Sequence, residues 1–321
     1  MAGLIRAIQE RLRRFPEVSQ WPELLSLVER ETLSARPCWE FTLDACEAVG
    51  GSRHDAEAGA SVVFCMLYSI HLVDDLLDDD PKGIYHQVGR AAAANMALAF
   101  QSVAGRLLGE CHLEAEAERF AHRRLAAACL GTAFGQMLDS HDFEGEEAYW
   151  RMVRLKTPPL FSFALFLGAL IGGATVNRAE AVASLGERLG EIIQISDDLH
   201  DALAKPAAPD WQRKATNLPI LYAATADHAE RQAFLNLVPE VANDEALERA
   251  QDILVRSGAF SYCAYRLVQA YRQARQQIDD LSLPRSEVMI DLFDHYIRPL
   301  RRLLQAVGVE VSDALFEGRD A

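Results

Sequence analysis

The sequence has few basic residues for its length, and this shortage excludes several classes of protein. Its 321 residues include 32 Lys and Arg against 47 Asp and Glu, which gives a formal net charge of −15. Proteins that bind nucleic acid or an anionic membrane surface usually carry a basic face, so we expect neither partner. A small phosphorylated substrate needs only a few local cations or a metal ion, and the acidic balance does not exclude it.

Cysteine pairs and long apolar runs are also missing. The six cysteines are scattered, form no C-x-x-C pair and mostly lie within apolar segments, which is typical of reduced core thiols. The most apolar segment, 160–174, is too short and too rich in glycine at its end to predict a membrane span. The first fifteen residues alternate apolar and charged side chains, unlike a signal peptide. We therefore expect a cytoplasmic protein without a membrane span.

Strand-like alternation of apolar and polar residues is nearly absent, whereas helical periodicity dominates. Apolar residues recur at spacings of three and four, and Ala, Leu, Glu, Arg and Gln, which favour helices, are abundant. Gly and Pro breaks separate these segments, but no linker is long enough to divide the chain. We predict an all-α protein with a single domain over residues 1–321. The helical pattern is clearest in six segments, which are 57–77, 88–108, 115–138, 161–173, 179–203 and 244–279.

Two acidic motifs stand out because each directly follows an apolar helical segment. The first is D-D-L-L-D at residues 74–78, and the second is D-D-L-H-D at residues 197–201. In a helix, the first and last Asp of each motif lie on one face about one turn apart, where like charges repel each other. Bound Mg²⁺ would relieve this repulsion, since it prefers carboxylate oxygens, water and phosphates. One such cluster is typical of a solvated helix end, but the recurrence of the pattern indicates metal binding.

Together with other short motifs, the acidic segments make the sequence resemble the trans-isoprenyl diphosphate (polyprenyl) synthase family. The resemblance runs from about residue 36 to residue 219. The further motifs occur in the family's order, and they are Arg36-Pro37, Gly135-Gln136-x-x-Asp139, Lys156-Thr157, Gln194-Ile195 and the lysine-containing loop 210–219. The resemblance implies a large helical bundle of the class I isoprenoid synthase type, in which the two acidic motifs face each other across a central apolar cavity.

This resemblance also implies an enzyme that uses several Mg²⁺ ions to ionise an allylic prenyl diphosphate. The ions would neutralise negative charge that develops on the leaving diphosphate. Carboxylates of both motifs would hold them, three as leading ligands and three as direct or indirect ones. The leading ligands are Asp74, Asp78 and Asp197, and the others are Asp75, Asp198 and Asp201.

Other side chains are implied to contact the substrate. Lys156 and Lys214 would bind the diphosphate as compact cations. Thr157 and Gln194 could orient the metal ligands or the diphosphate, and hydrogen bonds between buried helices explain them almost as well. Ser69 precedes the first motif, where family members set the depth of the hydrocarbon pocket, and its small side chain would permit a product longer than C15.

Three further polar residues have alternative roles. Gln136 and Asp139 could line the cavity or form structural hydrogen bonds. His71 lies three residues before Asp74 on the same helical face. An indirect partner of the metal ligands or a packing histidine is favoured for His71, since Mg²⁺ prefers oxygen to nitrogen.

The sequence departs from the family where a second substrate, isopentenyl diphosphate, would bind. Of the family's Gly-Gly-Lys-x-x-Arg-Pro motif only Arg36-Pro37 remains, and Leu67 stands at the expected histidine position. Residues 80–83 replace a pair of arginines, although Lys82 or Arg90 could compensate. Because a second dianionic diphosphate needs several cations, the sequence supports ionisation better than condensation.

Three functions therefore stay open. A prenyltransferase that elongates an allylic diphosphate is favoured by the breadth of the resemblance. A synthase-like terpene cyclase or lyase, acting on one prenyl diphosphate, is favoured by the missing cations. A non-catalytic partner subunit of a heteromeric synthase is the third, and the intact acidic motifs argue against it. A homodimer is expected from the family alone.

Overall fold

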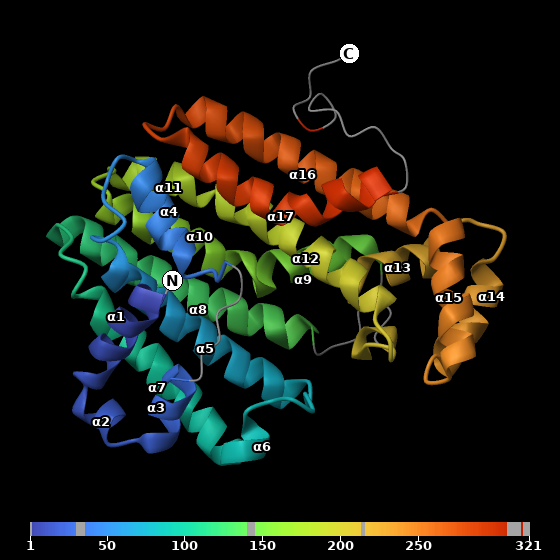
Figure 1. Cartoon of the computed structure of the whole chain (residues 1–321), viewed down its shortest axis with the longest axis horizontal. Helices are drawn as coiled ribbons and strands as arrows, with labels where there is room; N and C mark the ends of the chain where they lie inside the picture. Colours follow the sequence, from blue (N-terminus) through green and yellow to red (C-terminus); the bar gives the residue numbers. More distant parts are fainter. Residues whose placement is uncertain (1, 30–35, 140–144, 213–215, 307–315, 317–321) are drawn as a thin grey trace. The chain divides into compact units, whose positions relative to one another are not determined.

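The computed structural model describes residues 2–29, 36–139, 145–212, 216–306 and 316, and most of these residues are helical (Figure 1). No β-strand occurs in these ranges. The prediction of an all-α protein is confirmed. The chain divides into two compact units, each built from segments that are distant in sequence. They comprise Met1–Ala133, Pro159–Glu187 and Ile278–Leu292 in the first unit, and Phe134–Pro158, Arg188–Gln277 and Phe293–Ala321 in the second. The single domain stays a prediction.

The first unit is centred on α5 (Glu57–Leu77), which lies beside α7 (Arg90–Leu108) (Figure 1). Between Ala58 and Met66, every face of α5 carries small or apolar side chains, and this part of the helix is buried. The remaining helices of this unit are α1 (Ala2–Arg13), α2 (Pro16–Ser19), α3 (Pro22–Glu29), α4 (Glu40–Ala48), α6 (Tyr85–Val88), most of α8 (Ala115–Asp139), α10 (Pro158–Ile171) and α11 (Val176–Ala183).

The second unit contains most of α12 (Leu185–Leu203), which carries the second acidic motif, and α9 (Glu146–Lys156). Its later helices pack around the buried rings of Trp211 and Phe234, and they are the yellow to orange helices in Figure 1. The remaining elements are α13 (Leu218–Thr225), α14 (Arg231–Leu237), α15 (Asp244–Arg256), parts of α16 (Ala259–Leu281) and α17 (Ser286–Ala306), and the 3₁₀ turns Pro209–Trp211 and Val238–Glu240.

Two helical segments, Glu57–Leu77 and Glu146–Ile171, are long and apolar enough to cross a membrane. Of these apolar stretches, 50% and 67% respectively are buried inside the protein. A buried core helix of a globular protein can have the same length and composition, so this finding does not by itself indicate a membrane span. The cytoplasmic location stays a prediction.

Candidate active site

The first acidic motif lies at the C-terminal end of α5. Asp74 and Asp75 belong to the last turn, and Asp78 follows as the capping residue. Negative charge is unfavourable at a helix C-terminus, where the backbone carbonyls already concentrate negative charge. Burial raises the pKa of the Asp75 carboxyl and the charge of Asp80 adds to the rise, although a hydrogen bond from the backbone N–H of Ile84 opposes it. The motif therefore gathers carboxylates in a place that favours a bound cation.

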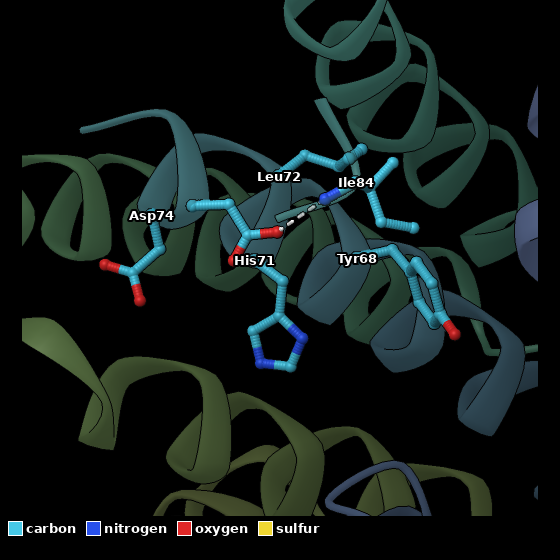
Figure 2. A pocket seen from close by; sticks show the side chains of 6 residues that line it. Tyr68, His71, Leu72, Asp74 and Ile84 are labelled. Carbon is cyan, nitrogen blue, oxygen red and sulfur yellow. Dashed lines mark hydrogen bonds between the residues drawn. The ribbon is translucent and has the colours of Figure 1, made fainter. Parts of the chain in front are cut away.

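A pocket of about 370 Å³ opens beside this motif. Figure 2 shows the side chains of Tyr68, His71 and Asp74 that line it, and the hydrogen bond of 3.3 Å from the Ile84 nitrogen to Oδ2 of Asp75. The His71 ring has accessible surface in the pocket but is surrounded by protein. This loss of water lowers the pKa of His71, against the opposing charges of the two aspartates. A neutral imidazole suits the expected indirect or packing role, which stays a prediction.

The second acidic motif lies in the C-terminal half of α12. Asp197 and Asp201 are one turn apart, and neither makes an ion pair with any described residue. Asp197 is accessible to solvent yet surrounded by protein, and the resulting loss of water, together with the charge of Asp201, raises its pKa to about 6. Burial also raises the pKa of Asp201. A divalent cation would relieve both effects, so this pair fits the predicted metal.

Asp198 differs from its neighbours in the motif, because it is only 1% exposed. Its Oδ2 accepts hydrogen bonds from Oη of Tyr149 at 2.6 Å and from the backbone nitrogen of Leu218 at 2.7 Å. Its Oδ1 accepts a third from Nε2 of Gln194 at 2.8 Å. Burial raises the pKa of Asp198 to about 7, and these three hydrogen bonds oppose the rise. Gln194 and Asp198 lie one turn apart on α12, so this bond does not link two helices, and the role of Gln194 stays a prediction.

Lys156 ends α9 next to Asp139, the last residue of α8. Its Nζ lies 2.6 Å from Oδ2 of Asp139, whose side chain is 7% exposed. Gly135 permits this approach, since a Cβ atom there would lie 2.4–2.6 Å from backbone atoms of Leu155 and Lys156. Thr157 follows as the capping residue of α9. The glycine of the Gly-Gln motif therefore positions a predicted substrate cation.

Two residues that could line the substrate cavity are buried, and each has a polar atom without a hydrogen-bond partner among the described residues. They are Ser69, which is 0% exposed, at its Oγ, and Gln136, which is 6% exposed, at its Nε2. A buried polar group without a partner costs about 1–3 kcal/mol, so such positions are rare unless a ligand or water satisfies them. Both residues are consistent with a lining role, within their own units.

Two of the three cations considered for a second diphosphate site, Arg36 and Arg90, form ion pairs with other side chains of the chain. Arg36 donates from Nη2 to Oδ2 of the buried Asp44 at 2.9 Å. Its Nη1 donates to the backbone oxygen of Asp291 at 3.2 Å. Arg90 pairs with Asp79, and Lys82 is exposed. The sequence already indicated too few cations to bind a second diphosphate, and these contacts leave fewer of them available.

Residues 34–254 match the family model described as polyprenyl synthetase. The chain belongs to the polyprenyl synthetase family. The geranylfarnesyl diphosphate synthase of Aeropyrum pernix is 27% identical over 288 residues, covering 81% of this chain and 89% of that protein. The nonaprenyl diphosphate synthase of Mycobacterium tuberculosis is 28% identical over 272 residues, covering 77% of this chain and 78% of that one.

Solved structures of synthases show the same fold. The geranylgeranyl pyrophosphate synthetase of Pyrococcus horikoshii has a TM-score of 0.78 at 22% identity, covering 99% of this chain and 96% of its own. The geranylgeranyl pyrophosphate synthase of Corynebacterium glutamicum, complexed with calcium and isoprenyl diphosphate, has a TM-score of 0.77 at 20% identity, covering 93% and 94%. The predicted isoprenoid synthase fold is confirmed, and its central cavity stays a prediction.

Membership of the polyprenyl synthetase family also confirms the predicted enzyme class, a prenyltransferase of isoprenoid biosynthesis, and places the protein among divalent-metal-dependent enzymes. The roles of the individual site residues stay predictions. Lys214 lies outside the described residues. Among the described residues, no group of three or more His, Cys, Asp or Glu side chains is arranged to hold a metal ion by itself.

Sequence reasoning missed the contacts that two residues of this polyprenyl synthetase, Tyr149 and Asn217, make with the second motif. Tyr149 reaches Asp198 from α9, and no local pattern marks it. Asn217 caps α13, where its Oδ1 accepts a hydrogen bond from the Ile220 nitrogen. An Asn directly before a Leu-Pro pair is a helix-start signal that could have identified its capping role.

Proposed function

We propose that this prenyltransferase binds an allylic prenyl diphosphate with Mg²⁺, ionises it and elongates it with isopentenyl diphosphate. Relatives named as geranylfarnesyl, geranylgeranyl and nonaprenyl diphosphate synthases each cover more than three quarters of the chain, which supports elongation. The Corynebacterium glutamicum neighbour complexed with calcium and isoprenyl diphosphate supports a divalent cation and a prenyl diphosphate as ligands. Chain elongation is therefore the function that the comparisons favour most.

The residues divide between holding cations and binding the diphosphate. Carboxylates of Asp74, Asp78 and Asp197 are the leading candidates to hold Mg²⁺, which when bound would neutralise negative charge on the leaving diphosphate. Lys156 supplies a compact cation suited to phosphate oxygens, and Asp139 fixes the place of its amino group. The apolar interior would shield the reactive allylic cation from water.

The observation that carries the proposal is the Asp197–Asp201 pair, two carboxylates one turn apart on α12. Burial raises the pKa of both, and the charge of Asp201 adds to the rise for Asp197. Asp197→Asn removes that charge and keeps the shape, and it should lower kcat/KM for an allylic diphosphate by about 10²–10³-fold. Asp74→Asn should act in the same way. Asp252→Asn, an exposed position on α15, serves as the control and should leave turnover unchanged. Near-normal turnover of the Asp197 and Asp74 variants would refute the metal assignment.

A second candidate function is a cyclase or lyase reaction on a single prenyl diphosphate. The ion pair of Arg36 with the buried Asp44, and that of Arg90 with Asp79, favour it, because both engage cations that a second diphosphate would need. This alternative requires hydrocarbon or alcohol products in the absence of isopentenyl diphosphate. The substrate assay that closes the Discussion separates it from elongation.

We also propose a homodimer that buries the exposed apolar faces of α7 and α8. Leu98 on α7 is 64% exposed and Leu130 on α8 is 74% exposed. Neighbouring exposed positions on the same two helices are also small and apolar, and they include Ala91, Ala94, Ala126 and Ala127. Exposed apolar residues that repeat along one face of a helix are typical of interaction surfaces. Sedimentation of Leu130→Glu should show a monomer if this face forms the dimer, and an unchanged species would contradict it.

A further inference from the structure

The Asp198 carboxylate accepts hydrogen bonds from two other elements of the second unit, α9 and α13, and from Gln194 on its own helix. It is the only residue of the described second motif that is so enclosed. We propose that Asp198 is a structural junction and not a metal ligand, and that Tyr149 and Asn217 are positioning residues for the substrate reaction. The inference rests on the proposed metal-dependent function, since it assigns the metal to Asp197 and Asp201 alone in this motif. It explains why one of three neighbouring aspartates is buried.

The helix geometry separates the motif into two faces. Successive residues of an α-helix are rotated by about 100°, so Asp198 points away from the direction of Asp197. Gln194 lies one turn before Asp198 and donates to it, which places both on the face turned toward the protein. Asp197 is accessible to solvent, whereas Asp198 is 1% exposed. A metal ion bound by the exposed face has no open path to the Asp198 oxygens.

The oxygens of Asp198 already have partners. Oδ2 accepts from Tyr149 and from the Leu218 nitrogen, and Oδ1 accepts from Gln194, with distances of 2.6, 2.7 and 2.8 Å. The carboxylate also lies at the N-terminus of α13, where the helix dipole favours negative charge. To bind a metal ion, Asp198 would have to give up hydrogen bonds that compensate a buried charge.

Asn217 completes the junction from the loop side. It is 0% exposed, and its Nδ2 donates to the backbone oxygen of Asp198 at 2.8 Å and to Oδ2 of Asp210 at 3.0 Å. The chain leaves α12 after Leu203 and is therefore tied back to α12 at Asp198, through both Asn217 and Leu218. The junction fixes the start of α13 against the helix that carries the predicted metal ligands.

Tyr149 connects the junction at Asp198 to the helix that carries Lys156. It lies on α9 seven residues before Lys156, and its hydrogen bond to Asp198 ties α9 to α12. Because α9 ends at Lys156 and α12 carries Asp197, this bond helps to set the position of the predicted diphosphate cation relative to the predicted metal ligand within the second unit. Tyr149 touches neither substrate nor metal in this account, so it acts by positioning.

Binding of Mn²⁺ with inorganic pyrophosphate, followed by electron paramagnetic resonance, tests whether Asp198 is a ligand. The purified full chain should bind ions in a pyrophosphate-dependent manner, and Asp197→Asn should lose at least one of them. Asp198→Asn should keep the wild-type number of ions, or should fail to fold where Asp197→Asn folds. Loss of an ion by folded Asp198→Asn, as in Asp197→Asn, would overturn the proposal. Absence of any such binding by the wild type would instead count against the proposed function.

Tyr149→Phe tests the positioning role without changing a residue of the acidic motif. Its thermal stability shows whether the hydrogen bond to Asp198 holds α9 and α12 together, and this result does not depend on the metal-binding experiment. Loss of one buried, charge-assisted hydrogen bond should lower the thermal midpoint of the metal-free chain by roughly 3–8 °C. The number of bound Mn²⁺ ions should stay unchanged, whereas kcat should fall at saturating metal and substrate. Tyr265→Phe, on the exposed side of α16, is the matched control and should change nothing. A Tyr149→Phe variant with the wild-type thermal midpoint and the wild-type kcat would overturn the proposed positioning role of Tyr149.

Discussion

The amino group of Lys156 lies 2.6 Å from Oδ2 of Asp139, so the cation predicted to bind the diphosphate is held in place by a carboxylate from the neighbouring helix. The carboxylate is almost fully buried, whereas the lysine is 23% exposed. Such a pair orients a flexible lysine side chain, which otherwise has considerable rotamer freedom. The pair thus links the Gly-Gln-x-x-Asp motif to the Lys-Thr motif that follows it.

Asp139→Asn tests this link. The variant keeps the size of the side chain and loses its charge, and we expect the free energy of unfolding to fall by about 1–3 kcal/mol, because one partner of a partly buried pair remains. The KM for the allylic diphosphate should rise, as it should for Lys156→Met, since both changes disturb the same cation. Denaturant titration and steady-state kinetics measure the two effects. Wild-type values for both in Asp139→Asn would show that the pair has no role.

Gly135→Ala should be far more harmful than a glycine substitution one turn earlier in α8. A Cβ at residue 135 would lie 2.4–2.6 Å from backbone atoms of Leu155 and Lys156, which cannot move aside singly. We expect a loss of about 1–3 kcal/mol in the free energy of unfolding and reduced affinity for the diphosphate.

Gly131→Ala is the control in the same helix. Its Cβ would lie 3.5 Å from Pro159, which is ordinary contact. Replacing a helical glycine by alanine should therefore stabilise the protein by about 0.5–1 kcal/mol. Thermal unfolding of the two variants compares them directly, and equal destabilisation would contradict the close approach of α8 and α9.

The sequence predicted the helices where one apolar pattern runs without interruption. The segment 57–77 coincides with α5, because its apolar run continues to the first motif. The segment 244–279 is instead divided into α15 and α16, since Gly258 adopts a φ of 87° that a helix cannot contain. Periodicity continues across such a break and cannot reveal it.

The candidate site was predictable at the level of motifs but not of individual roles. Asp197 and Asp198 are adjacent and chemically identical in the sequence, yet one is accessible and the other is a buried hydrogen-bond acceptor. The difference comes from Tyr149, 49 positions earlier, and from the Leu218 nitrogen, 20 positions later. Contacts over such separations depend on tertiary packing, which local patterns do not encode.

Replacing Ser69 tests its predicted part in setting product length. Ser69 is fully buried and its Oγ has no partner in the described part of the chain, so Ser69→Ala should raise the free energy of unfolding and leave the products nearly unchanged. Ser69→Phe should overfill the site, at a cost of about 1–3 kcal/mol in stability, and should shift products toward shorter chains. Chromatography of the released alcohols measures the shift. An unchanged product distribution in a folded Ser69→Phe variant would exclude Ser69 from the hydrocarbon pocket.

Glu40 should make the stability of the protein depend on pH. Burial, with the charge of Asp44, raises the pKa of Glu40 above its ordinary value of 4.5. The ionised form is therefore disfavoured in the folded state. Above the folded pKa this destabilises the protein, and the effect disappears as the pH falls through the folded value to below 4.5.

Glu40→Gln, which is neutral throughout, should accordingly be more stable than the wild type at pH 7, with the difference shrinking toward pH 4. Urea titrations across this range provide the comparison. A variant that is less stable than the wild type at pH 7 would show that the carboxylate makes net favourable contacts with nearby Arg53 and Arg36.

The central claim is that the protein elongates an allylic prenyl diphosphate, and one substrate assay tests it most directly. Purified protein with Mg²⁺ is given C10, C15 or C20 allylic diphosphates, each with and without isopentenyl diphosphate, and the products are identified by mass. Elongation predicts that consumption of at least one allylic substrate depends on isopentenyl diphosphate and yields a longer prenyl diphosphate. Hydrocarbon or alcohol formed at the same rate without isopentenyl diphosphate, and no longer diphosphate with it, would contradict the claim.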